Sequence, residues 1–414
     1  MPKTRQKPNK PRNNYPLFPH SNGQWAKKIR QKLYYFGPWS DPDAAEGKYL
    51  QEREYLQAGR NPPQVSDGCR LRDVVNRFLT LKETLRDNGE LAPRSFWDYH
   101  KACERMIEHF GSQRLVDDIG VEDFDAYLAK LSKGRGLHAI GTQVTLCRMV
   151  FNFAYENELI EKPVRFGQNF KRPTKKSMRI DRSKKQQANG LKMFEAEDIR
   201  RMLADATRPM KAMILLGLNG AFGAADLAAL PRTAINANWL TFARVKTGID
   251  RRIPLWSETV EAIAEVRKHR PMPKDEADKG LVFITKYGHR WVRTRPSGES
   301  NVDKVCDAFN KLLRLLELKR PGVSFYALRH TFETIGGGCG DQVAVDAIMG
   351  HVNDDMASLY RERIGDDRLQ AVTNHVREWL WTRKCGKCKE TQFSVADEWK
   401  CEACGKDHAA GKSS

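Results

Sequence analysis

The chain has 414 residues, with 71 Lys and Arg against 52 Asp and Glu and a formal net charge of +19. At roughly 150 residues per domain, this length predicts about three domains and excludes a single core. The positive excess exceeds what solubility requires, and its interleaving with aromatic residues near the start predicts nucleic acid, and not membrane lipid, as the polyanionic partner.

The apolar residues never form a run of about 18, the length that a membrane span needs. The first 16 residues, "MPKTRQKPNKPRNNYP", lack the apolar segment of a signal peptide. We therefore expect an intracellular protein, cytoplasmic and nucleoid-associated, whose nine cysteines are reduced.

The N-terminal 60 residues predict a basic arm followed by a small module. Residues 1–22 are rich in Pro, Asn, Lys and Arg and predict disorder, whereas 23–60 predict two short strands and a helix from Pro42 to Ala58. Cations mixed with aromatic groups favour DNA contacts, although some of the aromatic residues must form the core of the module. The candidate DNA-binding residues are Trp25, Lys27, Lys28, Arg30, Lys32 and Tyr34.

A linker rich in Pro, Gly and Asn, residues 59–68, precedes a helical region. Apolar spacing predicts four helices within residues 68–165, with starts near Leu71, Pro93, Val121 and Gly141. The basic connector that follows, 166–192, resists compaction unless phosphate neutralises it, and it can also serve as an exposed tether. Its candidate phosphate contacts are Lys171, Arg172, Lys175 and Lys176.

Residues 193–381 predict a mixed domain. A hairpin is expected from "WLTFARV" and "RRIPL" around a turn at 247–250. A short helix that begins at Asp354 or Asp355 would carry Tyr360, which taken alone is an ordinary apolar-face residue. The other predicted helices include 196–206, 210–218 and 224–230.

The C-terminal segment, 382–414, carries the strongest local motif. Two Cys-x2-Cys pairs, each beside a glycine, are separated by twelve residues. This spacing predicts one structural zinc ion held by four thiolates, with no open position for a water molecule. The ligands would be Cys385, Cys388, Cys401 and Cys404.

A second set of motifs is spread along the mixed domain: "VKTGIDRRIPL", "SFYALRHTF", "MGH" and a tyrosine nine residues after that histidine. The order of Lys246, Arg329, His351 and Tyr360 resembles the catalytic domain of the tyrosine recombinases, the phage integrase family. The preceding four-helix and strand-plus-helix modules are similar to that family's core-binding and arm-type domains.

The resemblance implies a reaction without a catalytic metal or nucleotide. Tyr360 would attack a DNA phosphodiester and form a 3'-phosphotyrosine, Lys246 would protonate the departing 5'-oxygen, and Arg329 and His351 would stabilise the phosphate charge. Double-stranded DNA, bound by a multimer that is a tetramer on paired sites, is the implied partner.

Two positions depart from the family pattern. In "NGAFGAADLAAL", Gly223 stands where the first catalytic arginine is expected. Tyr326 stands where the family often has histidine, and its hydroxyl can hydrogen bond but cannot act as a cation. The candidate replacements for the missing guanidinium are Arg232, Arg251, Arg252 and His330, which the sequence does not rank.

The sequence therefore predicts a mixed α+β chain, mostly α, with an arm-type module, a core-binding domain, a catalytic domain with a small antiparallel sheet, and a zinc ribbon. The leading hypothesis is a site-specific recombinase or integrase of a mobile element. The alternative is a recombinase-fold protein that binds DNA as an accessory or regulatory factor and has lost catalysis with the first arginine. A transcription component built on the zinc ribbon is weaker, because the ribbon occupies only the tail.

Overall fold

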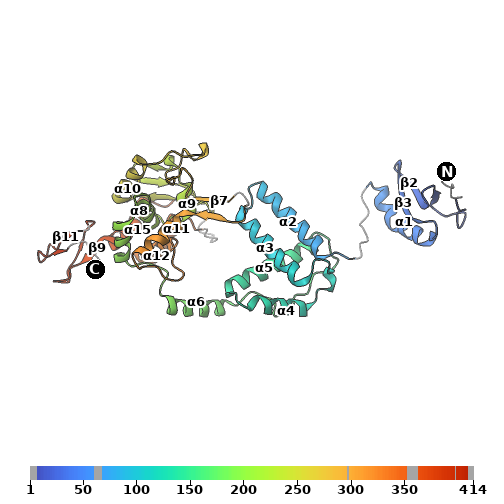
Figure 1. Ribbon diagram of the computed structural model, residues 1–414, viewed down its shortest axis with the longest axis horizontal. Coiled ribbons are helices and arrows are strands. Elements are labelled where there is room, and N and C mark those ends of the chain that lie inside the picture. Colours follow the sequence, from blue (N-terminus) through green and yellow to red (C-terminus); the bar gives the residue numbers. More distant parts are fainter. Residues whose placement is uncertain (1–6, 60–67, 296–297, 352–361, 397, 409–414) are drawn as a thin grey trace.

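The computed structural model describes residues 7–59, 68–295, 298–351, 362–396 and 398–408. The chain is elongated, with the N-terminal module at one end and the cysteine-rich segment at the other (Figure 1). Three separate hydrophobic cores lie along it, one in each of the larger units. The described helices include none that is long and apolar enough to cross a membrane.

The N-terminal module is a three-stranded antiparallel sheet, in the order β1-β2-β3, with one helix against it. Tyr15 and Leu17 are buried in its core and β1 pairs with β2, so the predicted disorder of residues 1–22 is wrong for this part. Asp41 caps the helix by accepting from the backbone N–H of Ala44 at 3.0 Å. The elements are β1 (Phe18–His20), β2 (Gln24–Ile29), β3 (Lys32–Pro38) and α1 (Pro42–Gln57).

The second unit is helical, and its interior is lined by aromatic rings such as Phe78, Phe124 and Phe151. Three of the four predicted helix starts agree with the structure, and the fourth helix begins at Leu137, four residues before Gly141. Pro93 occupies the first helical turn of α3, where its missing N–H costs nothing. The elements are α2 (Leu71–Asp87), α3 (Pro93–Phe110), α4 (Val121–Ser132) and α5 (Leu137–Glu156).

The basic connector contains a helix, α6 (Lys175–Asn189), which the charge pattern did not predict. Thr174 caps it by accepting from the backbone N–H of Ser177, and none of its residues is buried. This helix joins the second unit to the third along one side, as Figure 1 shows. On the other side the two units also touch, since Arg94 donates to the carbonyl of Glu299, near β8, at 3.0 Å.

The third unit is mostly helical, with a three-stranded sheet in the order β4-β5-β6 and a separate β7-β8 hairpin. Its central helix, α8, packs against α10 and α12. Gly217 permits the close approach to α12, because a Cβ atom there would lie 3.0 Å from Leu328 Cδ1. The helices are α7 (Ala196–Asp205), α8 (Arg208–Asn219), α9 (Ala224–Ala229), α10 (Ser257–Lys268), α11 (Lys304–Leu315), α12 (Ala327–Gly336), α13 (Gln342–Met349) and α15 (Asp366–Trp381). The strands are β4 (Ile235–Asn236), β5 (Trp239–Thr241), β6 (Arg252–Pro254), β7 (Val292–Thr294) and β8 (Asn301–Asp303).

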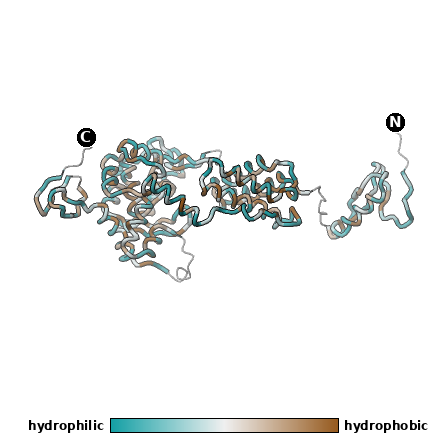
Figure 2. The backbone as a smooth tube through the Cα atoms, turned by 90° about the horizontal axis from the view of Figure 1, so that it is seen from below, coloured by the Kyte–Doolittle hydropathy of each residue, from teal (hydrophilic) through white to brown (hydrophobic). Residues whose placement is uncertain are grey.

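The cysteine-rich segment follows α15 directly and consists of two small hairpins. Figure 2 shows it as a narrow, largely hydrophilic extension of the chain. One hairpin pairs β9 (Thr382–Lys384) with β10 (Thr391–Phe393), and the other pairs β11 (Trp399–Lys400) with β12 (Asp407–His408). Such short strands bury little apolar surface, so the hairpins need another source of stability.

Candidate active site

Arg329 lies on the first turn of α12, and only 2% of it is exposed. Its Nη1 donates to the carbonyl of Ala221 and its Nη2 to that of Met349, both at 2.7 Å. Met349 is the last residue of α13, where helix carbonyls lack partners and carry partial negative charge, and Ala221 follows the C-cap of α8. The guanidinium therefore joins the ends of two helices, and burial, followed by the charge of Arg244, lowers its pKa.

His351 follows α13, whose C-cap Gly350 has a left-handed φ of 62°. The ring Nδ1 lies 3.2 Å from the Asp346 carboxylate, and Glu333 belongs to the same group of ligand atoms within 4.8 Å of one another. The Asp346 carboxylate holds the ring from its Nδ1 side, so Nε2 is the nitrogen that is left for a ligand. The side chain of His351 is 36% exposed, so Nε2 can meet a ligand.

The hairpin predicted around residues 247–250 is present and extends beyond β5 and β6. Phe242 N donates to Arg251 O at 3.0 Å, and Arg244 N donates to Ile249 O at 2.8 Å. Lys246 lies exposed at the tip of the hairpin. Its ammonium is therefore free to reach a ligand above the turn.

The hairpin is attached to the turn that carries His351. Arg244 Nη1 and Thr247 Oγ1 both donate to the carbonyl of Gly350, at 3.1 and 3.2 Å. Lys246 lies between these two contacts in the sequence. The structure thus brings together the segments of three expected site residues, those carrying Lys246, Arg329 and His351.

Gly223 is the N-cap of α9, and its φ of −92° and ψ of 170° suit any residue. A Cβ atom there would meet only Asp226 Oδ2, at 3.6 Å. The buried Asp226 carboxylate accepts from the backbone N–H groups of Gly223 and Val245, each at 3.1 Å. Asp226 therefore fixes the start of α9 to the hairpin.

Arg251 also points toward Asp226, with Nη2 3.5 Å from Oδ1. The side chain of Arg251 is fully buried, and its Cζ lies 4.5 Å from the centroid of the Phe222 ring. Burial lowers the pKa of Arg251 to about 10, while Asp226 raises it and Arg329 and Arg244 lower it. The cluster thus holds three guanidinium groups against one carboxylate.

The two expected tyrosines differ in what can be described. Tyr326 precedes α12, is 48% exposed, and packs edge-on against His330 at 5.4 Å between ring centroids. Tyr360, together with the predicted short helix around it, lies outside the described residues.

The amino-acid sequence of this region matches a known family over residues 192–364, the phage integrase family. Residues 192–364, hereafter the integrase domain, are therefore similar to this family. The match confirms the resemblance expected from the order of the motifs. None of the curated protein sequences compared with the chain matches it.

Solved structures extend the likeness beyond the integrase domain. A lambda integrase tetramer bound to a Holliday junction matches with a TM-score of 0.52 at 14% identity, over 86% of this chain and 98% of that chain. A dimer of lambda integrase residues 75–356 bound to a COC' core site matches with a TM-score of 0.52 at 15% identity, over 72% of this chain and 98% of that chain. At these identities the likeness concerns the fold.

Sequence reasoning missed three residues that organise the integrase domain: Asp226, Arg244 and Asp346. Asp226 lies within the segment "NGAFGAADLAAL", but its contact with the hairpin is made to Val245, 19 positions later in the chain. An arginine two residues before Lys246 offers no local signal. Asp346 lies five residues before His351, and the two side chains meet because a helix end followed by a turn lies between them.

In the N-terminal module the structure corrects one predicted DNA contact. Trp25 is 1% exposed and packs against Tyr15 at 4.9 Å, so it belongs to the core. Lys27 donates to the carbonyl of Pro16 at 2.7 Å and is half-buried. Trp25 is buried because α1 covers the face of the sheet from which Trp25 points.

The other basic candidates are available to a ligand. Lys32 lies 5.5 Å from the Tyr34 ring centroid, which leaves a cation beside an aromatic ring at the sheet edge. The exposed cations among the predicted DNA contacts are Lys28, Arg30, Lys32, Lys171, Arg172, Lys175 and Lys176.

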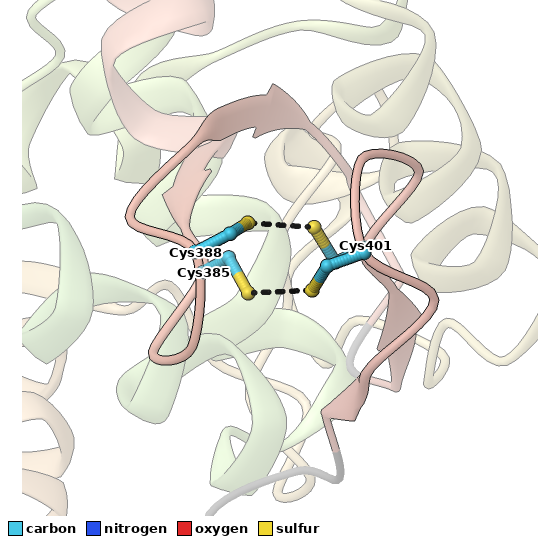
Figure 3. A group of neighbouring side chains, drawn as sticks. Cys385, Cys388 and Cys401 are labelled. Atoms are coloured by element: carbon cyan, nitrogen blue, oxygen red, sulfur yellow. Dashed lines mark hydrogen bonds between the residues drawn. The ribbon is translucent and has the colours of Figure 1, made fainter.

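The four predicted cysteine ligands converge between the two hairpins of the tail, and Figure 3 shows the paired sulfur atoms. Cys385 Sγ lies 3.6 Å from Cys404 Sγ, and Cys388 Sγ lies 3.5 Å from Cys401 Sγ. Four thiolates about 2.3 Å from a common centre would be separated by similar distances. All four cysteines are free of disulfides, so the cluster could hold a metal ion.

Proposed function

We propose that the chain is a site-specific DNA recombinase that cleaves and rejoins strands through a 3'-phosphotyrosine on Tyr360. The observation that supports this most is that Arg329, the Lys246 hairpin and the His351 turn all meet at Met349–Gly350. They do so within the integrase domain. A guanidinium, an imidazole and an ammonium at one place suit a phosphodiester, whose transition state gains negative charge.

The residues would divide the work by their chemistry. The phenol of Tyr360 releases its proton to solvent, its oxygen bonds to phosphorus, and the bond from phosphorus to the 5'-oxygen breaks. Lys246, exposed at the hairpin tip, gives that 5'-oxygen a proton. Arg329 and His351 neutralise the nonbridging oxygens, with Asp346 holding the Nδ1 side of the imidazole.

Binding would involve the whole length of the chain. The exposed cations of β2–β3 and of the connector would contact phosphates, which fix position without reading sequence. The matched lambda integrase structures include a dimer on a core site and a tetramer on a Holliday junction. By analogy, we propose that this chain acts on duplex DNA as a tetramer on paired sites.

The cysteine cluster would hold one structural zinc ion. Its ligands Cys385, Cys388, Cys401 and Cys404 fill a tetrahedral coordination sphere and leave no position for a reacting water. The metal would supply the stability that the two short hairpins lack.

Covalent trapping tests the proposed chemistry. The substrate would be a nicked suicide duplex built from any short repeat found beside the coding sequence, and it is expected to leave protein attached to DNA after denaturation. Tyr360→Phe should abolish the adduct, and Tyr287→Phe, at an exposed tyrosine of the same domain, is the matched control that should retain it. Sequence-specific binding without any adduct would refute the recombinase and support the accessory DNA-binding alternative.

A further inference from the structure

The integrase domain lacks an arginine at Gly223, yet its interior contains more guanidinium groups than its one central carboxylate can neutralise. Arg244, Arg251 and Arg329 act on one another electrostatically, and Asp226 supplies the opposing charge. Buried charges are retained only when they are paired or when they serve a ligand. This excess therefore calls for another anion.

Arg251 carries unused donors. Its Nε donates to the carbonyl of Phe242 at 3.2 Å, but its buried Nη1 and Nη2 have no hydrogen-bond partner among the described residues. The 3.5 Å approach of Nη2 to Asp226 is an ion pair without a hydrogen bond. Two orphaned groups on one planar cation match the paired oxygens of a phosphate.

Arg251 also lies where the absent side chain would have reached. Its guanidinium stacks on Phe222, the residue immediately before Gly223. Its Cδ lies 3.0 Å from the position of a Cβ atom on Gly350. Arg329 hydrogen-bonds the residues that precede these two, Ala221 and Met349. The two guanidiniums therefore occupy neighbouring places between the same pair of turns.

The other candidate replacements are engaged elsewhere. Arg252 forms a two-point ion pair with Asp366, at 2.8 and 2.7 Å. Arg232 lies beside Arg267, at the C-terminal end of α10, and near Arg270. His330 faces outward beside Tyr326.

We infer that Arg251 replaces the arginine missing at Gly223 and binds the scissile phosphate together with Arg329. The inference rests on the proposed recombinase function. Arg251 and Arg329 are both buried, at 1% and 2% exposed, so each would reach a phosphate only when the cluster is uncovered. The guanidinium would then come from the residue before β6 and not from the start of α9, and Asp226 contacts both positions.

The rate of adduct formation on a nicked suicide duplex tests this role. Arg251→Leu is expected to slow trapping about 100- to 1000-fold, the usual effect of losing one charged oxyanion donor. Arg252→Gln, at the adjacent position, is the matched control and should change the rate by less than about threefold, because its ion pair is exposed. Trapping by Arg251→Leu at the parental rate would overturn the inference.

A methylphosphonate at the scissile position separates phosphate binding from a structural role. The methyl group removes the charge that the guanidinium would neutralise, so the difference between parent and Arg251→Leu should shrink to less than about tenfold. Equal losses on the phosphate and methylphosphonate duplexes would assign Arg251 to the fold and overturn the inference. A parent that forms no adduct would instead refute the recombinase function itself.

A positional exchange keeps the test decisive if Arg251→Leu fails to fold. Gly223→Arg combined with Arg251→Leu retains one guanidinium beside Asp226, and the backbone of Gly223 accommodates a side chain. Recovery of at least about tenfold in trapping over Arg251→Leu, or any adduct where the single variant is unfolded, supports the inference. A folded exchange variant that forms no adduct on either duplex would overturn it.

Discussion

Asp226→Asn is expected to destabilise the integrase domain by about 3 kcal/mol. The carboxylate is 6% exposed and opposes the buried charges of Arg251 and Arg329. Removing one partner of a buried ion pair commonly costs about 3–5 kcal/mol. The lower value applies because Arg251 is 3.5 Å away without a hydrogen bond. Asn must also present its amide to one of the N–H groups of Gly223 and Val245, which leaves that donor unsatisfied.

The same reasoning predicts coupling between Asp226 and Arg251. In an Arg251→Leu background one buried cation is already gone, so Asp226→Asn should cost about 1–2 kcal/mol less than in the parent. Amide hydrogen exchange of α8 is a suitable measurement, because a chain with several cores does not unfold in two states and this helix lies within one core. Asp366→Asn, which breaks an exposed pair with Arg252, is the control and should cost less than about 1 kcal/mol. An equal cost of Asp226→Asn in both backgrounds would refute the charge imbalance.

Three further outcomes are expected. Gly350→Ala should lower the free energy of unfolding by about 1–3 kcal/mol and slow covalent trapping. The reason is that the φ of Gly350 is 62° and the new Cβ atom would lie 3.0 Å from Arg251 Cδ. Unchanged trapping would show that the turn does not position Arg251. Thr247→Val, which removes one donor to the carbonyl of Gly350, should slow covalent trapping. The melting temperature should fall by only a few degrees, as expected for a loss of about 1 kcal/mol. A trapping rate equal to that of the parent would show that this contact of the hairpin does not position the active site. Cys401→Ser, or a strong chelator, should release about one zinc ion per chain, measured by metal analysis, and should raise the hydrogen exchange of the amides in β9–β12. Purified protein that contains no zinc would contradict the assignment of a zinc site.

Local patterns predicted much of the architecture. Helix starts at Leu71, Pro93 and Val121 follow from apolar spacing and, at Pro93, from the fixed φ of proline. The hairpin and the four cysteines were predicted because turn residues and ligand spacing act over a few positions. The segment β1 was missed, since it is stable only through pairing with β2.

Which residues of the N-terminal module are buried could not be predicted from the local sequence. Alternation along a strand separates two faces but does not say which face a helix will cover. The sequence therefore allowed Trp25 as a DNA contact, but in the structure α1 covers it and it is buried. Lys28 and Lys32 are exposed. The helix α6 was not predicted, because a highly charged, solvent-exposed helix has no periodic apolar face in its sequence.

The active-site cluster shows a different limit. The sequence offered four replacements for the guanidinium missing at Gly223, and only contacts between distant segments separate them. Arg251 lies 28 positions later in the chain, directly before β6, and packs against Phe222 in the turn before α9. The proposed exchange of a side chain between the two positions would conserve the charge without conserving the motif.

Charge balance connects the stability of this cluster to its proposed chemistry. Three guanidiniums beside one carboxylate are held together by the surrounding core, and desolvation makes each unpaired cation costly. A phosphodiester at Arg251 and Arg329 would bring the missing negative charge. It would accept from Nη1 and Nη2 of Arg251 and from Nε of Arg329, which have no hydrogen-bond partner within the described part of the chain. Any ligand that binds only the folded state shifts the folding equilibrium toward it. The same imbalance that weakens the free domain would therefore favour cleavage-site DNA, and most strongly as charge accumulates on the phosphate in the transition state.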